Sequence, residues 1–147
     1  MESPMNAEME SGVKNAAKVT SANAALIYIV DDQVDLVELV SILLGRLGFR
    51  TQKFVSPLSA YAAFVSAEPK PDLLLVDYSM PEMNGLEFLR RCRAIGPKIK
   101  AITISGNLTT ELLSDSDVKP DLLLGKPFTA AELQLAVRTT LGQVWKA

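Results

Sequence analysis

The clearest pattern along the chain is an alternation between continuous apolar runs and segments whose apolar residues recur every three or four positions. A short continuous apolar run that is rich in β-branched residues predicts a strand buried on both faces of a sheet. The run at residues 49–55 carries more polar residues than the others, so we expect that strand near a sheet edge. The other predicted strands occupy residues 25–30, 72–77, 99–105 and 121–126.

Two of the intervening segments have a clear helical period. In residues 34–48 and 86–96 the apolar positions lie three or four apart, which places them on one face of a helix. A glycine, Gly48 or Gly96, closes each segment, as is common at helix C-termini. The residues expected to face the core are Val34, Val37, Val40, Leu44 and Leu47 in the first helix and Leu86, Leu89, Cys92 and Ile95 in the second.

Capping residues predict where two further helices begin. Ser56 is followed by Pro57, which suits an N-cap with proline in the first turn. Thr129 and Glu132 have the spacing of a capping box at the start of a closing helix that we expect to run to residue 145. A fifth, short helix is expected around residues 109–115.

Five strands that alternate with five helices predict an α/β fold with a five-stranded parallel sheet and helices on both faces. We expect the flavodoxin-like strand order 2-1-3-4-5. The 147 residues fit one domain, which we place at 25–147. The first 24 residues have no clear period and are expected to be a disordered N-terminal extension.

Composition and charge narrow the choice of function. The formal net charge is −2, so no bulk positive field favours direct nucleic-acid binding. No apolar run is long enough to cross a bilayer, and the single cysteine, Cys92, suits a reducing cytoplasmic setting. The absence of histidine excludes His-based catalysis and His metal ligation within this chain.

Polar residues stand at the ends of four of the predicted strands: Asp31 and Asp32, Asp77, Ser105, and Lys126. Each alone is explained by a turn, a helix cap or a solvated surface residue. In an open parallel sheet, however, the carboxyl ends of the strands form the ligand crevice, so these residues should converge. Three carboxylates at one edge repel one another unless a cation offsets them, and oxygen ligands favour Mg²⁺.

The stretches IVDD, LLLVDYSMPEMNG, ITISG and KPF, in this order, resemble the receiver domain of two-component response regulators, the CheY-like superfamily. The resemblance runs from about residue 25 to about residue 145. It implies that Asp77 accepts a phosphoryl group from a partner histidine kinase. It also implies that Asp31, Asp32, Asp77 and the backbone carbonyl of Ser79 hold Mg²⁺, and that Lys126, before a cis-proline, offsets charge on the phosphoryl oxygens.

The resemblance further implies a switch in which the Ser105 hydroxyl turns toward the phosphorylated Asp77. The change would be read on the face made by the fourth helix, the fifth strand and the fifth helix. The sequence departs from the family pattern at Leu123, where an aromatic residue is usual, and Phe128 is expected to pack in the core instead. The implied partners are a sensor histidine kinase or a histidine phosphotransfer protein and a downstream protein, with a homodimer on phosphorylation left open.

Three alternatives stay open from the sequence. The first is an Asp-nucleophile phosphatase of the haloacid dehalogenase type, although its second aspartate would fall at the position of Ser79. The second is a flavodoxin-like cofactor binder, which would place a phosphate against Asp31 and Asp32. The third is a degenerate receiver that only docks to partners. We expect a signalling domain, not an enzyme, because the resemblance implies catalysis only of its own phosphorylation and dephosphorylation.

Overall fold

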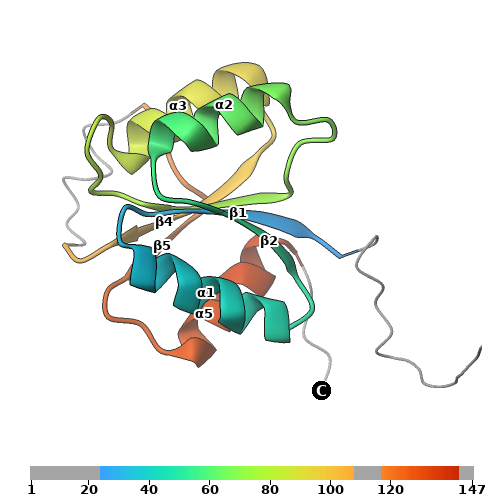
Figure 1. Cartoon of the computed structure of the whole chain (residues 1–147), viewed down its shortest axis with the longest axis vertical. Helices are drawn as coiled ribbons and strands as arrows, with labels where there is room; N and C mark the ends of the chain where they lie inside the picture. The colour runs from blue at the N-terminus through green and yellow to red at the C-terminus, as the bar shows by residue number, and fades with distance from the viewer. Residues whose placement is uncertain (1–23, 108–116, 143–147) are drawn as a thin grey trace, which may run out of the picture.

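The computed structural model describes residues 24–107 and 117–142, and its centre is a five-stranded parallel sheet (Figure 1). The strand order is β2-β1-β3-β4-β5, so the predicted order is confirmed. β2 lies at one edge, as its polar composition predicted. The strands are β1 (Leu26–Val30), β2 (Arg50–Phe54), β3 (Leu73–Asp77), β4 (Lys100–Ser105) and β5 (Leu122–Gly125).

Helices cover both faces of the sheet. Figure 1 shows α2 and α3 on one face and α1 and α5 on the other. The described helices are α1 (Val34–Arg46), α2 (Pro57–Ser66), α3 (Gly85–Ile95) and α5 (Ala130–Thr140). The short helix expected around residues 109–115 and the end of the last helix fall outside the described residues, as does nearly all of the expected N-terminal extension. No helix in the described ranges is long and apolar enough to span a membrane.

The core is divided into two layers by the sheet. Side chains alternate along each strand, so Ile27 and Ile29 of β1 pack toward α1 and α5, while Tyr28 and Val30 pack toward α2 and α3. All five residues of β3 are buried, because this strand is central and covered on both faces. The continuous apolar runs therefore did mark strands buried on both sides.

The predicted caps are confirmed. The Ser56 hydroxyl accepts hydrogen bonds from the first backbone N–H groups of α2. Thr129 and Glu132 form the reciprocal capping box at the start of α5. Each such cap stabilises a helix by about 1 kcal/mol, since it satisfies N–H groups that have no partner within the helix.

The prediction that Val34 and Ile95 face the core is wrong. Val34 is 55% exposed and Ile95 is 40% exposed. Both lie at a helix end, in the first turn of α1 and the last turn of α3, where the helix is no longer fully covered by the sheet. In α3 the fully buried Phe88, which the periodicity missed, widens the apolar face instead.

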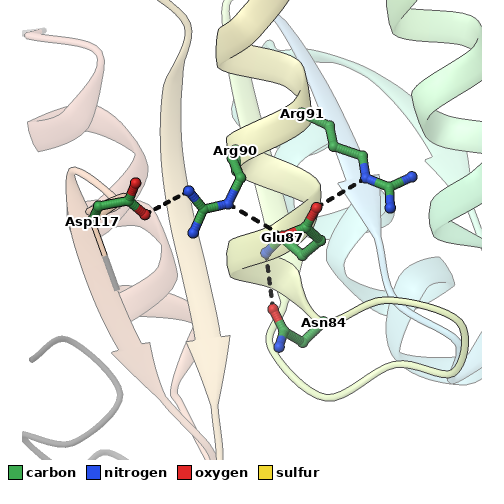
Figure 2. A network of polar contacts seen from close by, with 5 residues as sticks. All are labelled: Asn84, Glu87, Arg90, Arg91 and Asp117. Atoms are coloured by element: carbon green, nitrogen blue, oxygen red, sulfur yellow. Dashed lines mark hydrogen bonds and ion pairs between the residues drawn. The ribbon is translucent and has the colours of Figure 1, made fainter. Parts of the chain in front are cut away.

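A polar network joins α3 to the segment that precedes β5 (Figure 2). Asn84 caps α3 by accepting from the Glu87 N–H, and the Glu87 carboxylate pairs with Arg90 and Arg91. Arg90 also pairs with Asp117, which lies five residues before β5. The side chains of this network are exposed, in contrast to the buried aspartates at the strand ends.

Candidate functional site

The carboxyl ends of the central strands bring the predicted site residues to one edge of the sheet. Asp31 directly follows β1, Asp77 is the last residue of β3, and Lys126 directly follows β5. β1 and β3 are neighbours, so their two aspartates lie side by side. The structure therefore brings together charged residues that are up to 95 positions apart in the sequence, from Asp31 to Lys126.

Three aspartates form the acidic part of this cluster. One carboxylate oxygen from each of Asp31, Asp32 and Asp77 lies within 4.8 Å of the others. Asp31 and Asp77 are only 3% and 4% exposed, whereas Asp32 is exposed. Buried carboxylates at this separation repel one another, so the arrangement needs a compensating positive charge.

Lys126 supplies one such charge. Its Nζ lies 2.7 Å from Asp77 Oδ1 and 3.6 Å from Asp31 Oδ2. The ammonium also donates to Gln33 Oε1 at 3.4 Å. The Lys126–Pro127 peptide bond is cis, as the resemblance implied.

The electrostatics of the cluster appear in two pKa shifts. Burial raises the pKa of the Asp31 carboxyl; the hydrogen bond from the Gln33 N–H opposes this shift, and the charge of Asp77 adds to it. For Lys126, burial acts to lower the pKa of the ammonium, but the hydrogen bond to Asp77 and the charges of Asp31 and Asp77 outweigh burial and raise it. The ammonium is therefore held in its charged form, while ionised Asp31 is unfavourable without a further cation.

The same residues fit a hard divalent cation. Three carboxylates carry −3 and Lys126 carries +1, which leaves −2 to be balanced. Asp31 Oδ2 is buried and has no hydrogen-bond partner among the described residues, which leaves a lone pair available for a ligand. Carboxylate oxygens in a cluster of this kind suit Mg²⁺ better than a soft metal.

Ser105 is the last residue of β4 and reaches the same edge, and its hydroxyl is hydrogen-bonded to the Asn107 backbone. The Ser105 carbonyl accepts from the Lys126 backbone N–H at 2.9 Å, which fixes the two strand ends side by side. The Ser105 hydroxyl accepts from the Asn107 N–H at 3.0 Å and lies 3.3 Å from the Asn107 carbonyl. Its predicted role as a switch stays a prediction.

Three further residues were singled out in the sequence. Ser79 is exposed in the loop after β3, and the role of its carbonyl as a metal ligand stays a prediction. Leu123 is half-buried in β5, opposite Thr103 of β4. Phe128 packs against the core on the α1 and α5 side, as expected.

Sequence reasoning missed two residues that shape the site. Gln33 contacts Lys126, and a signal was present, because Gln33 directly follows the acidic pair at the same strand end. Gly85 begins α3, where an added Cβ would lie 2.6 Å from the Asp77 carbonyl oxygen. Only glycine lets the start of α3 come this close to the backbone of Asp77.

Comparison with known proteins assigns a class to this fold and cluster. The sequence profile of the response regulator receiver domain matches residues 27–138. The chain belongs to this family and is a receiver domain of two-component systems. The family assignment confirms the predicted resemblance.

Individual relatives agree with the assignment. The chain is 35% identical over 108 residues to the response regulator receiver protein CpdR of Brucella abortus, covering 73% of this chain and 88% of the relative. It is 29% identical to sporulation initiation phosphotransferase F of Bacillus subtilis, covering 78% and 92%. A solved receiver protein from Sinorhizobium medicae superposes with a TM-score of 0.73 at 29% identity, covering 83% of this chain and 98% of that one.

Proposed function

We propose that this receiver domain accepts a phosphoryl group on Asp77 in a Mg²⁺-dependent reaction. The observation that carries the proposal is the placement of Asp77, whose buried carboxylate at the end of β3 contacts Lys126 and lies within the aspartate cluster. A rigid central strand holds the nucleophile, and fixed charges next to it can stabilise a transferring phosphoryl group.

The donor is a phosphohistidine on a separate protein. An oxygen of Asp77 attacks phosphorus and forms the acyl phosphate bond. The P–N bond to the imidazole breaks, its electron pair stays on the ring nitrogen, and that nitrogen takes up a proton from solvent. This chain contains no histidine, so it cannot supply the donor. The Bacillus subtilis relative is named a phosphotransferase, and this name supports the proposal that such a domain can relay phosphoryl groups.

Asp31, Asp32, Asp77 and the Ser79 backbone carbonyl are the proposed Mg²⁺ ligands. When bound there, Mg²⁺ supplies positive charge that offsets the carboxylates and the phosphoryl oxygens. Lys126 offsets charge from the β5 side of the cluster, where it already donates to Asp77. Asp31 Oδ1 accepts a hydrogen bond from the Gln33 N–H, and Asp31 Oδ2 has no hydrogen-bond partner among the described residues, so Oδ2 is the oxygen proposed to bind the cation.

The proposed output is a switch or a relay. On phosphorylation the Ser105 hydroxyl would leave Asn107 and donate to the phosphoryl group, a local change that biases a two-state equilibrium. The proposed partners are a sensor histidine kinase or a histidine phosphotransfer protein and a downstream protein that docks on the face that the predicted fourth helix would form with β5 and α5. Leu123, in place of an aromatic residue, favours relay over ring-mediated switching.

We further propose that the domain is not an enzyme for a separate substrate, since its chemistry is confined to its own phosphorylation and dephosphorylation. The proposed compartment is the cytoplasm, where a single buried thiol such as Cys92 stays reduced. The net charge of −2 supports a protein partner rather than direct contact with nucleic acid.

The test is incubation with acetyl phosphate, with and without Mg²⁺, followed by intact mass. The expected result is a gain of one phosphate that needs Mg²⁺. The gain is lost in Asp77→Asn and kept in Asp35→Asn, a matched change of an exposed aspartate in the first turn of α1. A parent protein that gains no phosphate and binds no Mg²⁺ would contradict the proposal and leave a docking domain. Steady turnover of a phosphate monoester would instead identify a phosphatase.

A further inference from the structure

Gln33 has a backbone that is fixed on both sides next to the aspartate cluster. Its N–H donates to Asp31 Oδ1 at 2.9 Å. Its carbonyl accepts from the N–H groups of Leu36 and Val37, so Gln33 is the N-cap of α1 through its backbone. The side chain makes no cap hydrogen bond and is therefore free for another role.

The side-chain amide of Gln33 faces Lys126. The distance from Lys126 Nζ to Gln33 Oε1 is 3.4 Å. Because an ammonium can only donate hydrogen bonds, the amide oxygen must be the atom that faces it. Lys126 Nζ thus contacts Asp77 Oδ1 and Gln33 Oε1, and its third close neighbour is Asp31 Oδ2 at 3.6 Å, an ion pair that is too long for a hydrogen bond.

The amide nitrogen of Gln33 is then directed away from Lys126. Gln33 is exposed, and no residue in the described ranges accepts a hydrogen bond from this nitrogen. An N–H donor beside the partly buried Lys126 ammonium, at the carboxyl ends of the strands, is placed to meet an anion that approaches Asp77. The Gln33 side chain is uncharged, and this matters because a fourth carboxylate at this position would repel such an anion.

We propose that Gln33 positions Lys126 through Oε1 and donates from its amide nitrogen to a phosphoryl oxygen of the incoming phosphodonor. The inference rests on the proposed function, since it assumes that Asp77 accepts the phosphoryl group. It adds a residue of this chain that contacts the phosphodonor and a reason for an uncharged side chain at this position. The expected consequence is that removal of the amide weakens binding of the phosphoryl group and leaves the fold and the cation site unchanged.

The test compares Gln33→Met, which keeps the length and removes both polar groups, with Gln33→Glu, which keeps an acceptor for Lys126 and adds a negative charge. Gln52→Met in the edge strand β2 is the matched control, since Gln52 is also exposed and lies at a distance from the strand ends. The readouts are the rate of phosphorylation against acetyl phosphate concentration, the affinity for beryllofluoride, the affinity for Mg²⁺ and Tm.

For Gln33→Met we expect about fivefold weaker beryllofluoride binding and about fivefold slower phosphorylation at low acetyl phosphate, which is the usual contribution of one hydrogen bond. Tm and Mg²⁺ affinity should match those of the parent. For Gln33→Glu we expect a larger loss of beryllofluoride affinity together with tighter Mg²⁺ binding, because the added charge acts oppositely on the anion and the cation. Gln52→Met should match the parent in every readout.

A direct readout is the side-chain amide signal of Gln33 in a nitrogen–proton NMR spectrum. On addition of beryllofluoride with Mg²⁺, this signal should shift and that of Gln52 should not. If the parent is phosphorylated on Asp77 but Gln33→Met and Gln33→Glu both behave like it, the role of Gln33 is overturned and the proposed function stands. If the parent itself takes up neither phosphate nor beryllofluoride, both proposals fail.

Discussion

Charged residues occur in two very different settings in this domain. At the strand ends, Asp31 and Asp77 are almost completely buried, and the side chain of their partner Lys126 is 24% exposed. On α3, Figure 2 shows another network, in which Glu87 pairs with two arginines and Arg90 reaches Asp117. The side chains of that network are 37–73% exposed.

The difference between these two sets of charges is one of balance as well as burial. On α3 the charges of opposite sign are paired in water, where each pair contributes little to stability. At the strand ends, three carboxylates lie beside one ammonium in a site that is partly shielded from solvent. Interactions between charges are stronger there than in water. This excess of negative charge suits the proposed binding of a cation at the cluster, whereas the α3 network is balanced without any ligand.

The largest expected effect follows from removing the ammonium of the buried cluster. In Lys126→Ala, phosphorylation by acetyl phosphate should slow by about 100-fold, because one fixed charge that faces the transferring group is lost. Lys53→Ala is the control, since Lys53 pairs with the exposed Glu38 of α1. Rates can be followed by intact mass against time. A Lys126→Ala rate near that of the parent would show that Lys126 does not act on the phosphoryl group.

The next effect concerns the contact that positions Asp77. Gly85→Ala places a Cβ 2.6 Å from the Asp77 carbonyl oxygen, so the start of α3 must move. We expect a loss of about 2 kcal/mol in the free energy of unfolding, as for other overpacked sites, together with slower phosphorylation. Chemical denaturation measures the first effect and intact mass the second.

A glycine without that contact serves as the control. Gly45 lies within α1 and has no atom within 4 Å of an added Cβ, so Gly45→Ala should raise the free energy of unfolding by about 0.5 kcal/mol through helix propensity. If both substitutions had the same effect, the close approach of α3 to Asp77 would not matter.

A smaller effect of opposite sign is expected at Asp31. Burial raises the pKa of its carboxyl in the folded state, so ionisation of Asp31 destabilises the folded protein. Without divalent cations at pH 7, Asp31→Asn should therefore increase the free energy of unfolding. The gain should vanish below about pH 4, where aspartate is protonated in both states.

Added Mg²⁺ provides the internal check on this prediction. It should stabilise the parent and leave Asp31→Asn almost unchanged, because the variant has lost a proposed ligand. Denaturation curves measured with a chelator and with Mg²⁺ separate the two contributions. A variant that is less stable than the parent in chelator would show that the Asp31 charge is already balanced in the cation-free protein.

The smallest effect is expected in the exposed network. Arg90→Ala removes the ion pairs with Glu87 and Asp117, yet we expect no measurable change in Tm or in phosphorylation, because these charges are solvated before and after the change. Thermal unfolding at low and high salt is the measurement. A clear, salt-dependent fall in Tm would show that the contact between α3 and the segment before β5 contributes more than exposure suggests.

The fold was predictable because its signals are local and repeat along the chain. Continuous apolar runs marked the buried strands, and a polar run marked β2 as an edge strand. The convergence of Asp31, Asp77 and Lys126 followed from one rule, that parallel strands end at the same edge. Neither inference needed the position of any side chain.

The parts that the sequence did not predict depend on how elements meet. The periodicity of apolar residues predicted the buried faces of α1 and α3. It could not show that Val34 and Ile95, at the helix ends, are exposed. The contact of Gln33 with Lys126 joins residues 93 positions apart and depends on two side-chain conformations. The close approach at Gly85 is a distance between two backbones, which a glycine in the sequence suggests but does not locate.

The most direct test of the central claim locates the phosphate. The protein is phosphorylated with acetyl phosphate and Mg²⁺, reduced with borohydride, which converts an aspartyl phosphate to homoserine, and digested for peptide mass spectrometry. We expect homoserine at position 77 and unmodified aspartate at positions 31, 32 and 35. Phosphate at another position, or no reducible acyl phosphate on a phosphorylated protein, would contradict the assignment of Asp77 as the acceptor.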